Sequence, residues 1–221
     1  SVIHIAAADG SEDVLSYLLA AGKEKGSSSS STNDSKYKTL LMNCRDKSGN
    51  TPIMLAATAG HLKCVKILVL HHADLEVKDK GGGTCVMGAA KEGHAAIVKL
   101  LVQRRVKLDV ITKNSISVLH MPAFRGYDDV VSILVENKAR LGQRNREGCT
   151  PLMVASLRGN IPTIQILAAR MDRTLLDIQD IQGCTALIAL SKGGQADGVE
   201  ILMQYHASSD IVDNHGCTAL I

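Results

Sequence analysis

The chain has 221 residues, and its 25 Lys and Arg against 22 Asp and Glu give a formal net charge of +3. This charge is too small for a dedicated nucleic-acid binder unless it is clustered, and an aromatic content of 2% argues against base-stacking platforms and aromatic-lined cofactor pockets. No apolar run approaches the roughly 20 residues that a transmembrane helix needs.

The first segment, residues 1–22, predicts one helix over Val2–Asp9 and a second over about Ser11–Ala21. It is followed by an insertion, Lys23–Thr39, that holds five consecutive serines and almost no apolar residue. Such a composition cannot bury enough surface to offset the entropy lost on ordering. We therefore expect a mobile Ser-rich loop that is dispensable for folding.

The next segment shows a plan that later segments repeat. Thr51 and Pro52 form a helix-entry signal, because a hydroxyl can cap free amides and proline is pre-set for the first helical position. A short apolar helix follows and ends at Gly60, which supplies the left-handed conformation that a helix stop favours. The second helix carries Val65, Ile67, Leu68 and Val69, and a polar turn around Lys78 and Asp79 leads onward. Neither helix is long enough to be stable alone, so the pair must stack on a similar neighbour.

These signals recur with a period close to 33 residues. The helix-stopping glycines are Gly10, Gly60, Gly93, Gly126, Gly159 and Gly194. The capping hydroxyls are Ser1, Thr51, Thr84, Ser117, Thr150, Thr185 and Thr218. Aspartates, whose carboxylates can bond nearby amides, begin the turns at Asp46, Asp79, Asp180 and Asp213. Segments in phase with them read TPIMLAATAGH, TCVMGAAKEGH, SVLHMPAFRGY, TPLMVASLRGN and TALIALSKGGQ, preceded by VIHIAAADGS. This text and its period resemble the ankyrin repeat, a hairpin turn followed by two helices.

The resemblance implies an all-α fold, an ankyrin-like α-solenoid of helix-turn-helix repeats joined by β-hairpin turns. It covers everything except the insertion, so we expect a single repeat array over residues 1–221. The repeats are predicted at 1–22, 46–78, 79–111, 112–144, 145–179 and 180–212, with a partial seventh at 213–221. Because the chain starts and stops within a repeat, we expect a piece of a longer protein, monomeric or with end-to-end contacts through uncapped terminal repeats.

One repeat departs from the plan at Pro122, which lies inside its predicted first helix. Proline removes one helical hydrogen bond and crowds the preceding turn. We expect a locally distorted helix that tertiary packing tolerates. The alternative is that the distortion re-aims Phe124 and Arg125.

No sequence motif indicates catalysis, a cofactor or a metal site. Gly81 and the two glycines after it lie in a predicted turn, but no phosphate-binding sequence follows a strand. His71 and His72 would point about 100° apart on a helix, so the pair cannot bind one metal ion together. We therefore expect a chain that is not an enzyme and that binds neither cofactor nor metal.

The cysteines predict a reducing compartment. Stacked helices lie about 8–10 Å apart, whereas a disulfide needs Cα atoms within about 7 Å. Three of the six cysteines occupy equivalent positions of successive repeats: Cys149, Cys184 and Cys217. They are therefore too far apart to form disulfides or to share a zinc ion. The other three cysteines fit no C-x-x-C pattern. Reduced, structural cysteines are typical of the cytoplasm, with the nucleus as the alternative.

The resemblance implies that partners contact the hairpin tips and the exposed ends of the first helices. Equivalent positions of successive repeats, at the ends of the first helices, should lie side by side. They place Phe124 beside Leu157 and Arg125 beside Arg158, one period of 33 residues apart. Exposed apolar residues paired with arginines are typical of interface hot spots. A basic rim is predicted at and beside the tips, formed by Lys47, Lys80, Lys113, Arg144 and Arg146. The alternatives are that this rim is only a solvated edge and that Pro122 turns Phe124 into the core.

The sequence thus predicts a non-catalytic scaffold that binds another protein, through a partner segment with an apolar anchor and acidic flanks. One alternative is a binder of a phosphate-rich ligand (RNA, a phosphopeptide or an anionic membrane) through the basic tips, whose affinity should fall steeply with salt. Another is the recognition segment of an enzyme whose catalytic domain lies outside this chain.

Overall fold

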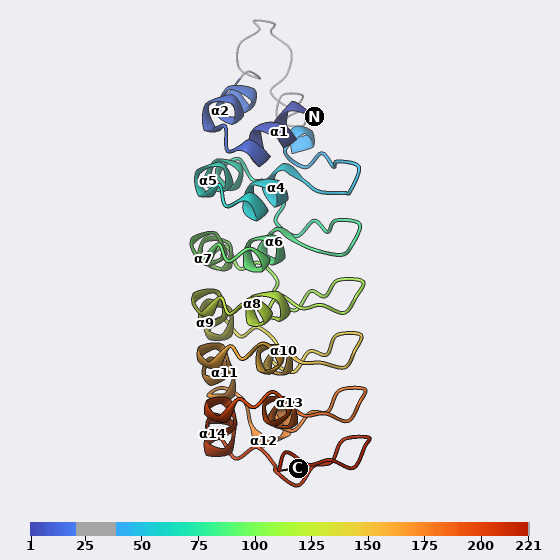
Figure 1. The fold of residues 1–221 in the computed structure, drawn as a ribbon. Coiled ribbons are helices and arrows are strands. Elements are labelled where there is room, and N and C mark those ends of the chain that lie inside the picture. Colours follow the sequence, from blue (N-terminus) through green and yellow to red (C-terminus); the bar gives the residue numbers. More distant parts are fainter. Residues whose placement is uncertain (21–38, 221) are drawn as a thin grey trace, which may run out of the picture. The chain divides into compact units, whose positions relative to one another are not determined.

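The computed structural model describes residues 1–20 and 39–220, which fall into two parts, Ser1–Lys107 and Leu108–Ile221. Both parts are built from pairs of short helices (Figure 1). The N-terminal part holds α1 (Val2–Asp9), α2 (Glu12–Ala20), α4 (Pro52–Ala59), α5 (Leu62–Leu70), α6 (Cys85–Lys91) and α7 (Ala95–Gln103). The C-terminal part holds α8 (His120–Arg125), α9 (Asp128–Glu136), α10 (Pro151–Arg158), α11 (Ile161–Ala168), α12 (Arg173–Leu176), α13 (Ala186–Lys192) and α14 (Ala196–Gln204).

Within each part, like helices of successive pairs pack against one another. The first helices form the series α1–α4–α6 in the N-terminal part and α8–α10–α13 in the C-terminal part. The second helices form α2–α5–α7 and α9–α11–α14. Fully buried aliphatic side chains such as Leu68, Leu101, Leu134 and Leu167 fill the space between them. The predicted all-α architecture of stacked helix pairs is confirmed.

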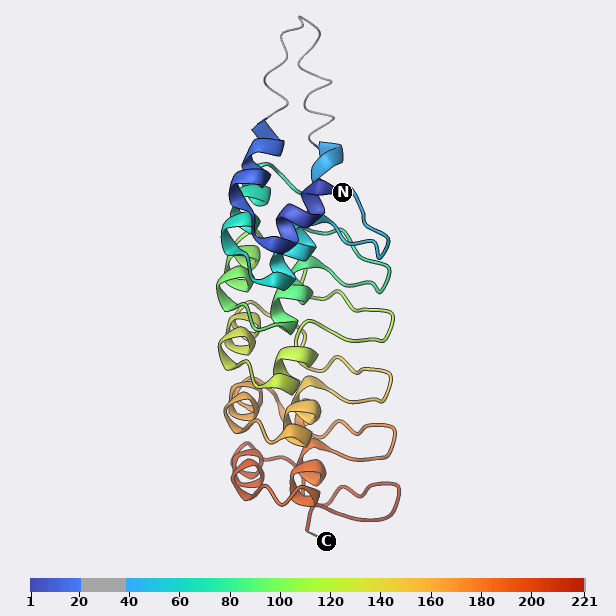
Figure 2. The same cartoon turned by 45° about the horizontal axis from the view of Figure 1, so that its top comes forward.

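The pairs are joined by turn segments that extend from one side of the helices in each part (Figure 2). No strand is present in the described ranges, where one isolated antiparallel bridge joins Ile111 to Ser117. The turn aspartates act as predicted. Oδ1 of Asp180, for example, accepts hydrogen bonds from the amides of Gln182 at 2.8 Å and Cys184 at 2.9 Å. The equivalent Asn145 accepts the corresponding pair of amide bonds.

Some helix ends follow the predicted signals, but the hydroxyls of Thr51 and Thr84 do not: each is buried and forms no cap hydrogen bond with another described residue. The hydroxyls of Thr150 and Thr185 accept amide hydrogen bonds at the starts of α10 and α13. Gly159 ends α10 with φ of 66°, and a Cβ there would lie only 2.5 Å from Oε1 of Gln195. This position therefore requires glycine for its backbone angle and for the close approach of the next repeat.

Pro122 distorts its helix as predicted. Counterparts of α8 begin directly after the capping hydroxyl, as α10 does at Pro151. By contrast, α8 begins only at His120, three residues after Ser117. Pro122 has no amide hydrogen with which to bond the carbonyl of Val118, so residues 118 and 119 form a turn, closed by the bond from the amide of His120 to the carbonyl of Ser117 at 3.2 Å, and the α-helix starts later. The shortened helix still leaves Phe124 exposed, so the alternative in which Phe124 joins the core is wrong.

The Ser-rich insertion, Lys23–Thr39, lies outside the described residues except for Thr39. None of the helices in the described ranges is long and apolar enough to cross a bilayer.

Candidate functional site

An arginine stacked on a phenylalanine marks the exposed ends of two neighbouring helices. The guanidinium carbon of Arg158, the last residue of α10, lies 4.8 Å from the centre of the Phe124 ring on α8. Phe124 is 41% exposed, and the adjoining Leu157 is 59% exposed. The side-chain amide of Asn160 donates to the carbonyls of Ala123 at 2.8 Å and Phe124 at 3.0 Å. These bonds fix the end of α8 and hence the position of the ring.

The guanidinium of Arg158 forms no hydrogen bond or ion pair with another described residue; its contact is with the face of the Phe124 ring. Such stacking is worth about 0.5–1 kcal/mol at an exposed site. The guanidinium lies over the ring, and its N–H donors are not used by any described residue. A planar fork of this kind matches a carboxylate or phosphate group.

A groove of about 440 Å³ lies beside this stack, between the exposed sides of α10 and α13 and the turns that precede them. Its apolar lining includes Met153, Leu157, Ile181 and Ala189, and its polar lining includes Glu147 and Lys192. Ile181 is 64% exposed at the tip of a turn. Ile181 was not among the residues predicted for the site. The equivalent position holds Lys or Arg in the four preceding repeats, and this change to isoleucine was the signal in the sequence that could have indicated it.

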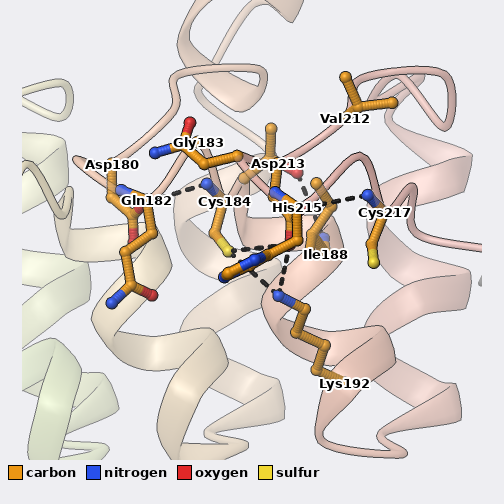
Figure 3. Close-up of polar contacts among 12 residues, drawn as sticks. Asp180, Gln182, Gly183, Cys184, Ile188, Lys192, Val212, Asp213, His215 and Cys217 are labelled. Carbon is orange, nitrogen blue, oxygen red and sulfur yellow. Dashed lines mark hydrogen bonds and ion pairs between the residues drawn. The ribbon is translucent and has the colours of Figure 1, made fainter.

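The positive charge of Lys192 is already neutralised inside the protein. Its ammonium donates to Oδ2 of Asp213 at 2.6 Å and lies 3.5 Å from Sγ of Cys184 (Figure 3). The Asp213 side chain is 0% exposed, and its Oδ1 accepts from the amides of His215 at 2.9 Å and Cys217 at 3.0 Å. The bond to Lys192 and these amides lower the pKa of Asp213 to about 2. The same bond to Asp213 raises the pKa of Lys192.

The cysteines at the groove are protonated structural groups. Burial raises the pKa of the Cys149 thiol to about 11, and burial also raises the pKa of the Cys184 thiol. Each thiol faces the turn aspartate of the following repeat, with sulfur-to-Oδ2 distances of 3.9 Å to Asp180 and to Asp213. All six cysteines are free thiols. No group of His, Cys, Asp and Glu side chains within residues 1–20 and 39–220 could hold a metal ion.

The predicted basic rim is exposed, but two of its arginines also connect neighbouring turns. Arg144 donates through Nε to the carbonyl of Gly148 at 3.1 Å and through Nη2 to that of Gln179 at 2.9 Å. Arg146 donates through Nη2 to the carbonyl of Lys113 at 2.9 Å. The other predicted site residues are exposed: Lys113 in a turn and Arg125 at the end of α8 in the C-terminal part, and Lys47 and Lys80 in turns of the N-terminal part.

The geometry therefore brings three of the predicted residues, Phe124, Leu157 and Arg158, into one cluster. It places Arg144 and Arg146 in the turns, where they have a structural role in addition to any role in binding. It adds Ile181 and the groove, which column spacing alone had not indicated.

The chain matches the family model for ankyrin repeats (3 copies) over residues 1–113 and 86–176. Its fold is similar to the crystal structure of the ankyrin repeat domain of Bcl-3, described as a unique member of the IkappaB protein family. The TM-score is 0.82 at 20% identity, over 100% of this chain and 92% of that one. It is also similar to the human ASB11 ankyrin repeat domain, with a TM-score of 0.76 at 22% identity, over 100% of this chain and 90% of that one.

No curated protein matches the sequence. Ankyrin repeats are protein–protein interaction modules, and theirs is a non-catalytic interaction fold. The matching family model, the period of the helix signals and the stacked helix pairs agree, and the chain belongs to the ankyrin repeat family.

Proposed function

We propose that this chain binds a segment of another protein on the surface formed by Phe124, Leu157, Arg158 and the adjoining groove, and that it performs no chemistry itself. The observation that carries the proposal is the Arg158–Phe124 stack next to a groove with exposed Leu157 and Ile181 on its walls. Large apolar side chains and arginines at the centre of a surface are typical of binding hot spots.

The surrounding charges favour a partner segment with an apolar anchor and acidic flanks. Lys113, Arg125, Arg144 and Arg146 are exposed in the same part of the chain, where they would form a basic rim. Lys47 and Lys80 are exposed in turns of the N-terminal part. Rim charges mainly set the association rate and its salt dependence, whereas the apolar centre sets the dissociation rate. The six unpaired cysteines support a reducing compartment such as the cytoplasm as the place of binding.

The proposal is tested by affinity purification of partners from cell extract with the wild-type chain and a Phe124→Ala/Leu157→Ala variant. The matched control is Met203→Ala, which truncates an exposed apolar side chain on α14 in the same part of the chain. We expect proteins that the wild type and the control retain at high salt and that the double variant loses. If the same proteins bind to all three chains, the surface is misplaced. If retained material is mostly nucleic acid or lipid and is released by moderate salt, the ligand is phosphate-rich.

A further inference from the structure

We propose that Arg158 binds a side-chain carboxylate of the partner, and that the groove holds an aliphatic side chain next to that acidic residue in the partner's sequence. This inference rests on the proposed function, because it specifies what the same surface recognises. It assigns the acidic flank to one arginine and the apolar anchor to one groove.

Arg158 is prepared for this role by its neighbours. The Phe124 ring holds the guanidinium at 4.8 Å, and Asn160 fixes the backbone that carries the ring. A side chain that is already positioned loses less conformational freedom on binding than a mobile one. A carboxylate can then accept two parallel hydrogen bonds from the planar fork, which is a strong and geometrically specific contact.

Other cations at or near the groove are already engaged. Lys192 is paired with the fully buried carboxylate of Asp213. Arg144 and Arg146 donate to backbone carbonyls of neighbouring turns. An incoming carboxylate would have to compete with these partners, whereas at Arg158 it would displace only water. The greatest gain for an added negative charge is therefore at Arg158.

The acidic groups lie at the other end of the groove. Glu147 is in the turn that precedes α10, whereas Arg158 is the last residue of this eight-residue helix. They are thus separated by at least the length of α10, about 12 Å. Asp180 also lines the groove and holds its own turn amides. Among the groups that line the groove, Glu147 and Asp180 thus repel a partner carboxylate, whereas Arg158 attracts one at the helix end.

The groove itself suits an aliphatic side chain. Its volume of about 440 Å³ falls at the small end of the range of about 300–1,000 Å³ for ligand pockets. Leu157 lines the groove, and Arg158 is the next residue of α10 but lies outside the lining, so a partner segment would reach the groove and the guanidinium with different side chains. A single unpaired guanidinium matches one carboxylate, whereas a doubly charged phosphate usually recruits several arginines. These observations favour Asp or Glu over a phosphorylated residue.

The test begins with a phage-displayed library of random dodecapeptides selected on the wild-type chain. We expect enriched sequences with Asp or Glu within two residues of Leu, Ile or Met. The best peptide is then synthesised with its acidic residue, with the corresponding amide (Asn or Gln) and with phosphoserine in that place. Affinities are measured by fluorescence polarisation for wild type, Arg158→Gln, Arg158→Lys and the control Arg170→Gln, an exposed arginine in the same part.

The wild type and the control should bind the acidic peptide about tenfold or more tightly than the amide peptide. The amide peptide cannot form the charge-assisted bidentate pair with Arg158. For Arg158→Gln this ratio should fall to nearly one. Arg158→Lys keeps the charge and should lose most of the ratio, since lysine has no planar fork. Thermal melting of each variant shows whether it is folded. If Arg158→Gln does not fold, the comparison of wild type with Arg158→Lys still tests the inference.

Three outcomes overturn the inference. If Phe124→Ala and Leu157→Ala weaken binding but the carboxylate preference does not depend on Arg158, the carboxylate assignment is wrong and the proposed function stands. If the phosphoserine peptide binds more than tenfold tighter than the acidic one, the ligand is a phosphate. If no peptide is enriched, or if binding ignores Phe124 and Leu157, both the inference and the proposed function fail.

Discussion

The ammonium of Lys192 lies 2.6 Å from Oδ2 of Asp213, although the two residues are 21 positions apart in the chain. Lys192 ends the first helix of one repeat, and Asp213 begins the turn of the next. The pair therefore couples the conformation of a turn to the helix of the preceding repeat. Because the Asp213 side chain is fully buried, its charge is stabilised there by the ion pair, together with the bonds from the amides of His215 and Cys217.

Lys192→Met should lower the thermal midpoint, because it leaves a buried carboxylate without its cation. The pKa of Asp213 is about 2, below its ordinary value of 3.8. Its contribution to stability is thus fully present above about pH 4 and is lost as the pH falls towards 2. Unfolding followed by circular dichroism between pH 2 and 5 should show a weaker pH dependence in Lys192→Met than in wild type. Lys99→Met, which removes an exposed lysine from α7, is the control; an identical pH profile in all three chains would contradict the account.

Much of the fold could be predicted from spacing, because each repeat must present the same caps, stops and buried positions to its neighbours. Thr150 caps α10 and Gly159 ends it, as its sequence predicts. The short helix α12, which lies within the repeat predicted at 145–179, was not predicted from the sequence. Asp172 in fact caps this helix by accepting a hydrogen bond from the amide of Leu175 at 3.0 Å.

The candidate site was predicted less completely than the fold. Column spacing pairs residues one period apart, so it placed Phe124 beside Leu157. The stack instead joins Phe124 to Arg158, one position further along, because a long arginine side chain reaches across to the neighbouring helix. Likewise, the spacing cannot show that Arg144 bends back to bond turn carbonyls, since this depends on side-chain conformation.

Arg144→Ala should destabilise the fold by about 1–2 kcal/mol, since hydrogen bonds from a charged donor to two turns are lost. Arg146→Ala removes a single hydrogen bond to a turn carbonyl and should cost less than about 1 kcal/mol. Urea unfolding monitored by circular dichroism measures both. If Arg144→Ala is as stable as wild type but binds a partner more weakly, the role of Arg144 lies in the rim and not in the turns.

Lys138→Gly should stabilise the protein by about 0.5–1 kcal/mol. Lys138 follows α9 with φ of 65°, a left-handed conformation that strains a residue with a Cβ atom but not glycine. The matched control is Asn137→Gly, one residue earlier at φ of −96°, which should be neutral or destabilising. Equal effects of the two substitutions on the urea midpoint would show that φ is not the cause.

The cysteines at equivalent repeat positions should remain reduced and free of metal. Thiol titration of the folded protein at pH 8 should show slow reaction at Cys149, whose burial raises its pKa to about 11. After unfolding, all six thiols should react. Metal analysis of natively purified protein is the second measurement, and stoichiometric zinc or a missing pair of thiols would contradict this expectation.

The most direct test of the central claim is the affinity of wild type and Phe124→Ala for the strongest selected peptide, measured by isothermal titration calorimetry at low and high salt. Phe124 is 41% exposed, so its truncation should lower the melting temperature by only a few degrees and leave the fold intact. The account predicts that Phe124→Ala loses about 2 kcal/mol or more of binding free energy, whereas Met203→Ala loses none, and that salt weakens wild-type binding only modestly. Unchanged affinity in Phe124→Ala, or a steep loss of wild-type affinity with salt, would contradict it.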